Sequence, residues 1–335
     1  MSFMSVLLAL LLEQVRPLGQ NNPVAVGVRA YVRWVAKNFN AGEARQAHLT
    51  WGLAVGAPTL ATLLVELLLH FYFGWFLAMV WNVAVLYLTL GFRQFSFHFS
   101  QIRTALTAGN EDAARQLLAT WQQDQAANLS QLSSSQIVQQ VMALSVLAAH
   151  RHVFGVLAWY CIPAALGGGP AGAVFYRLSE WVAQDWQRGA QAPDRFSTPD
   201  TSLQKTANAA WAWVNWLPAR ITLVSFALVG RFEQTIAVWR SSGKAGPDND
   251  SLILAAASQA VGLRFDPAPH HTPVADDTLA GGSSPTSQTR QEAAAPELLE
   301  TPGPSHLAVI VGLLWRTVVM WMLLLALLTF AYWLG

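Results

Sequence analysis

The sequence predicts an all-α polytopic integral membrane protein, with several transmembrane helices and helical cytoplasmic segments between them. Of its 335 residues, 53% are hydrophobic and only 12% are charged, whereas soluble domains carry about 25% charged residues. Lysine and arginine are absent between Arg45 and Arg93, between Arg151 and Arg177, and after Arg316. Each gap can hold helices of the roughly 20 apolar residues that cross a bilayer. The chain is therefore expected to have the lipid bilayer as its main partner.

Charge and cysteine content exclude several classes of function. The net charge is +1 and the pI is about 8.0, so no basic excess indicates a nucleic-acid partner. Cys161 is the only cysteine, which excludes intramolecular disulfides and thiolate metal clusters. The sequence leaves open whether the chain forms a homo-oligomer.

Residues 1–50 predict a short N-terminal membrane helix followed by a basic segment. The apolar run at the start is too short to span a bilayer, and Glu13 and Arg16 follow it without a small-residue cleavage site. This order of residues is not that of a cleaved signal peptide.

Residues 51–92 predict a transmembrane hairpin with its turn at Phe71–Gly74. Basic residues flank both outer ends of the hairpin and none lies in the turn, so the positive-inside rule places both ends in the cytoplasm. Glu66 and His70 lie four residues apart on one helix face. An ionisable residue inside a span is a functional candidate by default, but hydration of Glu66 near the outer boundary is the plainer interpretation.

Residues 93–152 are expected to form amphipathic helices on the cytoplasmic side. Apolar residues recur at helical spacing from Ile102 to Trp121. Gly109–Asp112 predicts a turn into a helix with acidic residues in its first turn. Residues 122–140 are rich in Gln, Ser and Asn, and we expect them to form a solvated connection.

Residues 153–176 predict a membrane helix that breaks at Gly167-Gly168-Gly169-Pro170. Arg151 and Arg177 flank this apolar stretch, and a single span would put one of these basic flanks outside. A helix that turns back at the glycines keeps both flanks inside. Such irregular backbone persists at membrane depth only where protein or a water-filled cavity surrounds it.

The remaining chain divides where its composition changes. Residues 177–265 alternate apolar and polar residues with several tryptophans, which predicts helices in the cytoplasm or along the membrane interface. Residues 266–305 are dense in Pro, Ser, Thr, Gly and Asp, which predicts a disordered linker. Residues 306–335 predict a C-terminal transmembrane helix, with Arg316 reaching toward the interface.

Individual residues indicate a site only weakly. His150-Arg151-His152 opens the third apolar stretch and suits a metal or phosphate site, although a basic interfacial anchor is the plainer interpretation. Arg220 follows Pro218 and suits a phosphate, or again an interfacial anchor. The glycine run lacks Walker A or dinucleotide-loop spacing, and no Ser/His/Asp triad, HExxH or CxxC is present. The motif search therefore identifies no enzyme.

Four short segments, in order, resemble motifs of the CobD/CbiB family of cobalamin-biosynthesis membrane proteins and of the related AmpE family. They include a GDxxxAR-like turn, a glycine turn followed by a Tyr-Lys-like pair, a PARLT-like segment and an SPN…ALGVxLGG-like stretch. The matching segments are Gly109–Arg115, Gly167–Gly172 with Tyr176-Arg177, Trp216–Thr222, and Asp248-Asn249 with Val261–Leu263.

The resemblance implies a multi-pass protein of a bacterial inner membrane that acts in adenosylcobinamide-phosphate synthesis. In that step adenosylcobyric acid, a corrinoid substrate, is joined by an amide bond to aminopropanol or its phosphate. ATP and Mg²⁺ are expected only if the chain is catalytic, and no tightly bound cofactor is expected. The residues expected to bind substrate are Arg115, His150, Arg151, His152, Gly168, Gly169, Arg177, Pro218, Arg220 and Asn249. The side chains left as Mg²⁺ ligands are Glu111, Asp112 and Asp248.

The sequence departs from the family pattern at its polar blocks. Asn22 stands where the family has a histidine, and Ser145–Gly155 matches an acidic block but carries no carboxylate. Leu178–Trp181 keeps one acid, Glu180. Because Mg²⁺ prefers carboxylate oxygen ligands, the alternative is a non-catalytic AmpE-like inner-membrane sensor or accessory protein linked to β-lactamase regulation. A transporter is disfavoured because too few full spans are visible for inverted repeats.

Overall fold

The structure is a computed structural model that describes residues 2–16, 23–39, 44–122, 132–191, 201–242, 248–264, 300 and 302–334. Within these ranges the regular elements are helices, and one isolated bridge joins Leu263 to Glu300. The predicted all-α fold is confirmed. Most of the predicted disordered linker, residues 266–305, lies outside the described residues.

Four described helices are long and apolar enough to cross a membrane. They are Arg45–Phe73, Ser134–Ala165, Ser202–Val229 and Pro304–Ala331. Two shorter apolar helices accompany them, Phe3–Val15 and Trp75–Thr89. The chain is therefore a membrane protein with several apolar helices, as its composition predicts, while the orientation of the predicted hairpin stays a prediction.

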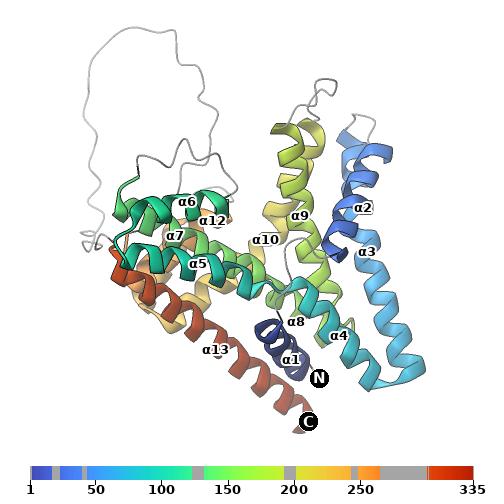
Figure 1. The fold of residues 1–335 in the computed structure, drawn as a ribbon. Coiled ribbons are helices and arrows are strands. Elements are labelled where there is room, and N and C mark those ends of the chain that lie inside the picture. The colour runs from blue at the N-terminus through green and yellow to red at the C-terminus, as the bar shows by residue number, and fades with distance from the viewer. Residues whose placement is uncertain are drawn as a thin grey trace.

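The N-terminal part contains the predicted hairpin. Helix α1 spans Ser2–Val15, α2 spans Pro23–Phe39, α3 spans Ala44–Phe73 and α4 spans Trp75–Thr89. Gly74 joins α3 to α4 with φ of 79°, a conformation that favours glycine. Helix α1 lies beside α4 and α13, and α2 lies along α3 (Figure 1).

A central helix follows two amphipathic ones. Helices α5 (Phe92–Thr107) and α6 (Glu111–Gln122) precede α7 (Ser134–Ala149), a π-helical turn (His150–Phe154) and α8 (Gly155–Ala165). In the apolar window of this Ser134–Ala165 helix 78% of residues are buried, against 17% for α3. The helix that we expected to begin at Val153 thus begins at Ser134. Its first turns contain Gln and Ser side chains, which in the sequence are typical of a solvated connection.

The glycine run breaks the helix as predicted. Helix α8 ends at Ala165 and α9 (Ala171–Gln191) returns after it. Gly167 and Gly169 have φ of 80° and 55°, which L-residues with a side chain rarely adopt. The turn lets α9 pack back against α8.

The C-terminal part begins with a second long central helix. Helix α10 spans Thr201–Val229, and α11 (Phe232–Ser242), α12 (Asn249–Val261) and α13 (Leu307–Leu334) follow it. Sequence reasoning placed α10 within an interfacial or cytoplasmic segment, but the helix is long enough to span. Its apolar second half lies against α12 and α13 (Figure 1).

Two hydrophobic cores share the helices α9 and α10. The larger core includes Leu86, Ile102, Met142, Leu223 and Ile253, each fully buried. The smaller one packs α2 and α3 against α9 and the start of α10.

The start of the central helix depends on a capping box. Ser133 accepts a hydrogen bond from the Gln136 backbone N–H, and the Gln136 side chain accepts one from the Ser133 N–H. We expect Ser133→Ala to lower the free energy of unfolding by about 1 kcal/mol. Denaturant titration of detergent-purified protein measures this free energy. The control is Ser135→Ala, two residues later in the same helical turn, which should lower the free energy of unfolding less.

Candidate functional site

The π-helical turn in the central helix holds the basic cluster His150-Arg151-His152. A π turn inserts one residue into an α-helix and occurs often at functional sites. His150 contacts Asn215 and Thr222 of α10, and Arg151 pairs with Asp250 of α12. His152 lies beside Gly91 and interacts electrostatically with Arg177 of α9. His150 is fully buried.

His150 is held by neutral partners on two helices. Its Nε2 lies 2.7 Å from Asn215 Oδ1 and its Nδ1 lies 2.9 Å from Thr222 Oγ1. The Tyr176 hydroxyl also donates to Asn215 Oδ1, at 3.0 Å. Because a carboxamide oxygen only accepts, Nε2 carries the proton and Nδ1 accepts from the Thr222 hydroxyl. This network fixes the ring in one tautomer.

Two ion pairs flank the histidine. Arg151 pairs with Asp250 of α12, and Arg177 pairs with Glu180 one turn later on α9. The side chains of the second pair are 10% and 4% exposed. Arg151 also interacts electrostatically with Glu180 and Tyr176, so the two pairs form one charged group. Buried charges of this kind persist only when paired.

Several buried polar atoms of this group have no hydrogen-bond partner among the described residues. They are Arg151 Nε, His152 Nδ1, Arg177 Nε and Asp250 Oδ1. Buried polar atoms in native proteins nearly always have a partner. Their concentration at one place leaves several hydrogen-bonding positions open to water or to a polar ligand.

A proline inside α10 shapes the neighbouring wall. Pro218 has no backbone N–H, so the carbonyl of Val214, four residues earlier, lacks its helical donor. The Trp159 indole N–H of α8 donates to that carbonyl at 3.0 Å. Arg220 follows at the edge of the site, stacked on Trp216 at 4.1 Å and 3.5 Å from Asn249 Oδ1. The carbonyl that Pro218 leaves free therefore links α10 to α8, the second part of the central helix.

A mostly apolar cavity of about 380 Å³ adjoins the site at Arg177. Tyr31, Trp81 and Trp181 are among its lining residues, and the Arg177 guanidinium lies 5.5 Å from the Trp181 ring. Trp81 Nε1 is a second buried donor there without a described partner. The cavity offers an apolar wall with donors at its edge, which suits a ligand with both kinds of surface.

The structure brings together most, but not all, of the residues expected to bind substrate. The residues that converge around the π turn are His150, Arg151, His152, Arg177, Pro218, Arg220 and Asn249. Asn249 also donates from Nδ2 to the Ala212 carbonyl, at 2.8 Å. The role of these residues in substrate binding stays a prediction.

The remaining expected residues lie elsewhere. Arg115 bonds to Glu111 at 2.9 Å and to Asp112 at 2.7 Å within α6. Asp248 caps α12, where its Oδ1 accepts from the Ser251 N–H at 3.3 Å. Each expected Mg²⁺ ligand thus already has a structural partner, and the described residues contain no group of three or more His, Cys, Asp or Glu side chains placed to hold a metal.

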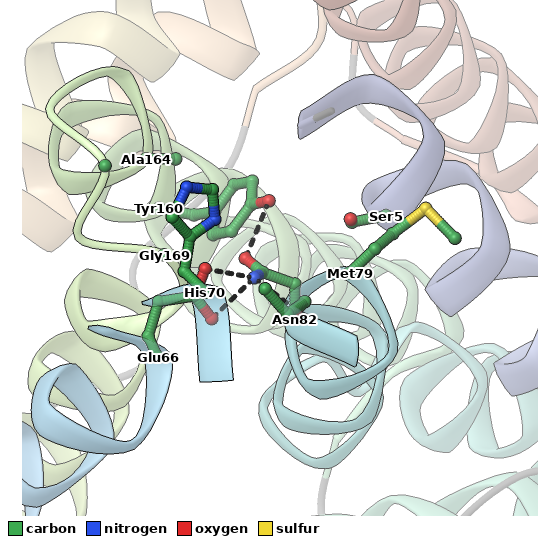
Figure 2. Close-up of a pocket in the computed structure, with 10 residues that line it drawn as sticks. Ser5, Glu66, His70, Met79, Asn82, Tyr160, Ala164 and Gly169 are labelled. Carbon is green, nitrogen blue, oxygen red and sulfur yellow. Dashed lines mark hydrogen bonds between the residues drawn. The ribbon is translucent and has the colours of Figure 1, made fainter. Parts of the chain in front are cut away.

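Gly168 and Gly169 lie at the opposite end of α8, away from the π turn. A Cβ on Gly169 would lie 2.5 Å from Glu66 Cδ, and one on Gly168 would lie 3.1 Å from Pro163 Cβ. Gly169 lines a second cavity, which also includes Glu66 and Asn82 (Figure 2).

Sequence reasoning missed Asn215 and Asp250 as site residues. Asn215 is a single amide within a Trp-rich apolar stretch, five residues before the PARLT-like arginine, and its isolation among apolar residues was the available signal. Asp250 directly follows the expected Asn249. Its importance depends on an ion pair with Arg151, 99 residues away, which no local pattern predicts.

Comparison with known proteins gives the chain its family. The family model described as regulatory signalling modulator protein AmpE matches residues 1–280. Two similar proteins are named cobalamin biosynthesis protein CobD. The one from Stutzerimonas stutzeri is 27% identical over 337 residues, which cover 96% of each chain. The one from Chromobacterium violaceum is 25% identical over 269 residues, 75% of this chain and 72% of that protein. No solved structure matches.

The family match covers most of the described structure, from α1 to α12, and the predicted resemblance is confirmed. The chain is a membrane protein that belongs to the AmpE family.

Proposed function

We propose that this chain is a non-catalytic regulatory protein of a bacterial inner membrane, in which the π-turn site binds a ligand that carries carboxylate or amide oxygen atoms. One observation carries the proposal: both carboxylates at the site, Glu180 and Asp250, are paired with arginines, while Nε of each arginine is buried and has no partner among the described residues. The site thus offers donors to an acceptor-bearing ligand. Arginine is the residue that suits such planar contacts.

ATP and Mg²⁺ do not fit the residues present. The expected ligands Glu111 and Asp112 are neutralised by Arg115, and Asp248 is engaged in a helix cap. We therefore derive no reaction step through a metal or nucleotide. The family description, a regulatory signalling modulator, supports the proposal of a non-catalytic regulatory protein.

A second candidate is an adenosylcobinamide-phosphate synthase-like activity in cobalamin biosynthesis. It is favoured by the likeness to CobD proteins over most of the chain. Corrinoids carry carboxylate and amide arms, so a corrinoid is also a reasonable first probe for the binding proposal.

Equilibrium dialysis of the detergent-purified protein with adenosylcobyric acid tests both candidates, with corrinoid absorbance as the readout. We expect saturable binding without turnover when aminopropanol phosphate, ATP and Mg²⁺ are added. Arg220→Ala should weaken binding by about tenfold or more, since a charged hydrogen bond contributes about 1.5–3 kcal/mol. Arg240→Ala, on the exposed face of α11, is the matched control and should bind normally.

The possible results separate the candidates. ATP-dependent amide product that falls in Arg220→Ala would replace the binding proposal with the synthase. Absence of both binding and product from folded protein would contradict both candidates for a corrinoid.

A further inference from the structure

The cavity at the far end of α8 contains a carboxylate in unusual surroundings. Glu66 lies within the apolar span of α3, is 6% exposed, and lines a cavity of about 130 Å³. His70, Asn82 and Tyr160 also line this cavity, together with Ser5 of α1 (Figure 2). A carboxylate at such a position is costly unless a positive charge or a proton neutralises it.

The partners of Glu66 are those of an ionised carboxylate. Asn82 Nδ2 donates to both Glu66 oxygens, each at 2.9 Å. The same nitrogen lies 2.8 Å from the Ala78 carbonyl, which only accepts, so the amide orientation is fixed. The Tyr160 hydroxyl donates to Asn82 Oδ1 at 3.2 Å and holds it from the other side. A protonated Glu66 would need an acceptor, and Asn82 presents N–H groups to it.

Among the described residues, Glu66 has no ion-pair partner, although His70 lines the same cavity and interacts with it electrostatically. An ionised carboxylate accepts at about four lone-pair positions, whereas one amide nitrogen serves it here. The two Glu66 oxygens can therefore accept further interactions from the cavity.

The glycine turn encloses this carboxylate. A Cβ on Gly169 would lie 2.5 Å from Glu66 Cδ and 2.9 Å from Oε1, so only a glycine lets the backbone approach this closely. Gly167 lines the same cavity. The glycine run thus does more than break a helix, because its backbone packs directly against the Glu66 side chain.

We propose that the cavity between Glu66, Asn82 and Tyr160 binds one small monovalent cation, with the Glu66 carboxylate as its anionic ligand. A single carboxylate with neutral oxygen atoms suits one positive charge, whereas divalent ions such as Ca²⁺ take six to eight oxygen ligands that include several carboxylates. An alkali ion and a small alkylammonium group share this chemistry. The cavity is too small for a bulky organic cation.

Thermal unfolding of the detergent-purified full chain tests the proposal. Chloride salts of sodium, potassium, methylammonium and the bulky N-methyl-D-glucamine are compared at constant ionic strength. We expect at least one of the three small cations to raise the unfolding midpoint saturably, by about 5 °C, because a ligand that binds only the folded state stabilises it. The most effective salt identifies an alkali ion or an alkylammonium group.

Matched variants locate the effect. Glu66→Gln keeps the size of the side chain and should abolish the rise, while Glu233→Gln, exposed at the start of α11, should retain it. If Glu66→Gln does not fold, equilibrium dialysis of the unmodified chain decides, with about one small cation per chain expected. Equal midpoints in all four salts, an undiminished rise in Glu66→Gln, or no bound cation would each overturn the proposal and leave a proton as the neutralising charge.

Discussion

Replacing Arg177 with methionine should lower the free energy of unfolding by about 3–5 kcal/mol, the range for breaking a buried ion pair from one side. Glu180, its partner, is buried and would keep its charge, with Gln184 as its remaining hydrogen-bond donor among the described residues. The penalty arises from this carboxylate, which would keep only its longer-range interaction with Arg151, rather than from lost packing, because methionine retains most of the volume. Denaturant titration in detergent, followed by tryptophan fluorescence, measures it.

The double variant Arg177→Met, Glu180→Met separates the causes. Removal of both charges should recover most of the loss, since apolar replacement of a whole buried pair is often neutral or stabilising. Arg33→Met is the control, because the Arg33–Asp185 pair is 68% and 24% exposed and such pairs contribute less than about 1 kcal/mol. Additive losses in the double variant would contradict the assignment.

Replacing Gly172 with alanine should lower the free energy of unfolding by about 3 kcal/mol, or prevent folding, because it overpacks a rigid contact. Pro163 leaves the Trp159 carbonyl without its helical donor, and a Cβ on Gly172 would lie 1.9 Å from that oxygen. Backbone atoms cannot rotate away as a flexible side chain does, so α8 and α9 would have to separate. Thermal unfolding and the yield of monodisperse protein report the change.

Gly56→Ala is the matched control. Nothing lies within 4 Å of a Cβ at Gly56 in α3, and alanine in a helix interior is favoured over glycine by about 0.5–1 kcal/mol. This variant should be as stable as the original chain or slightly more stable. Equal losses in the two variants would indicate that the contact between α8 and α9 is not tight.

Features that depend on local composition were predictable. The hairpin around Gly74 and the break at Gly167–Gly169 follow from apolar runs interrupted by glycine, and both are present. The start of the central helix at Ser134 was not predicted, because buried polar residues such as Gln139 carry the pattern of a solvated segment. Burial depends on neighbouring helices, which a single stretch of sequence does not reveal.

The site was predictable only where short motifs mark it. His150, Arg177 and Arg220 could be named because charged or imidazole side chains border apolar stretches. That Arg151 meets Asp250, or that Glu66 meets Asn82, follows from tertiary contacts between distant segments. The same contacts show why Arg115 lies outside the π-turn site, since its guanidinium is engaged by Glu111, Asp112 and the Leu132 carbonyl.

Trp159 connects three helices through two prolines. Its indole N–H donates to the Val214 carbonyl, which Pro218 leaves without a helical donor. Its own backbone carbonyl, which Pro163 leaves without a helical donor, packs against Gly172. A rotation of α8 about its axis would break the link to α10 and the contact with α9 at the same time. Helices α8, α9 and α10 should therefore move as a single rigid body. Any signal that passes between the π-turn site and the Glu66 cavity would then be a displacement of this unit as a whole, carried along α8 from one end to the other.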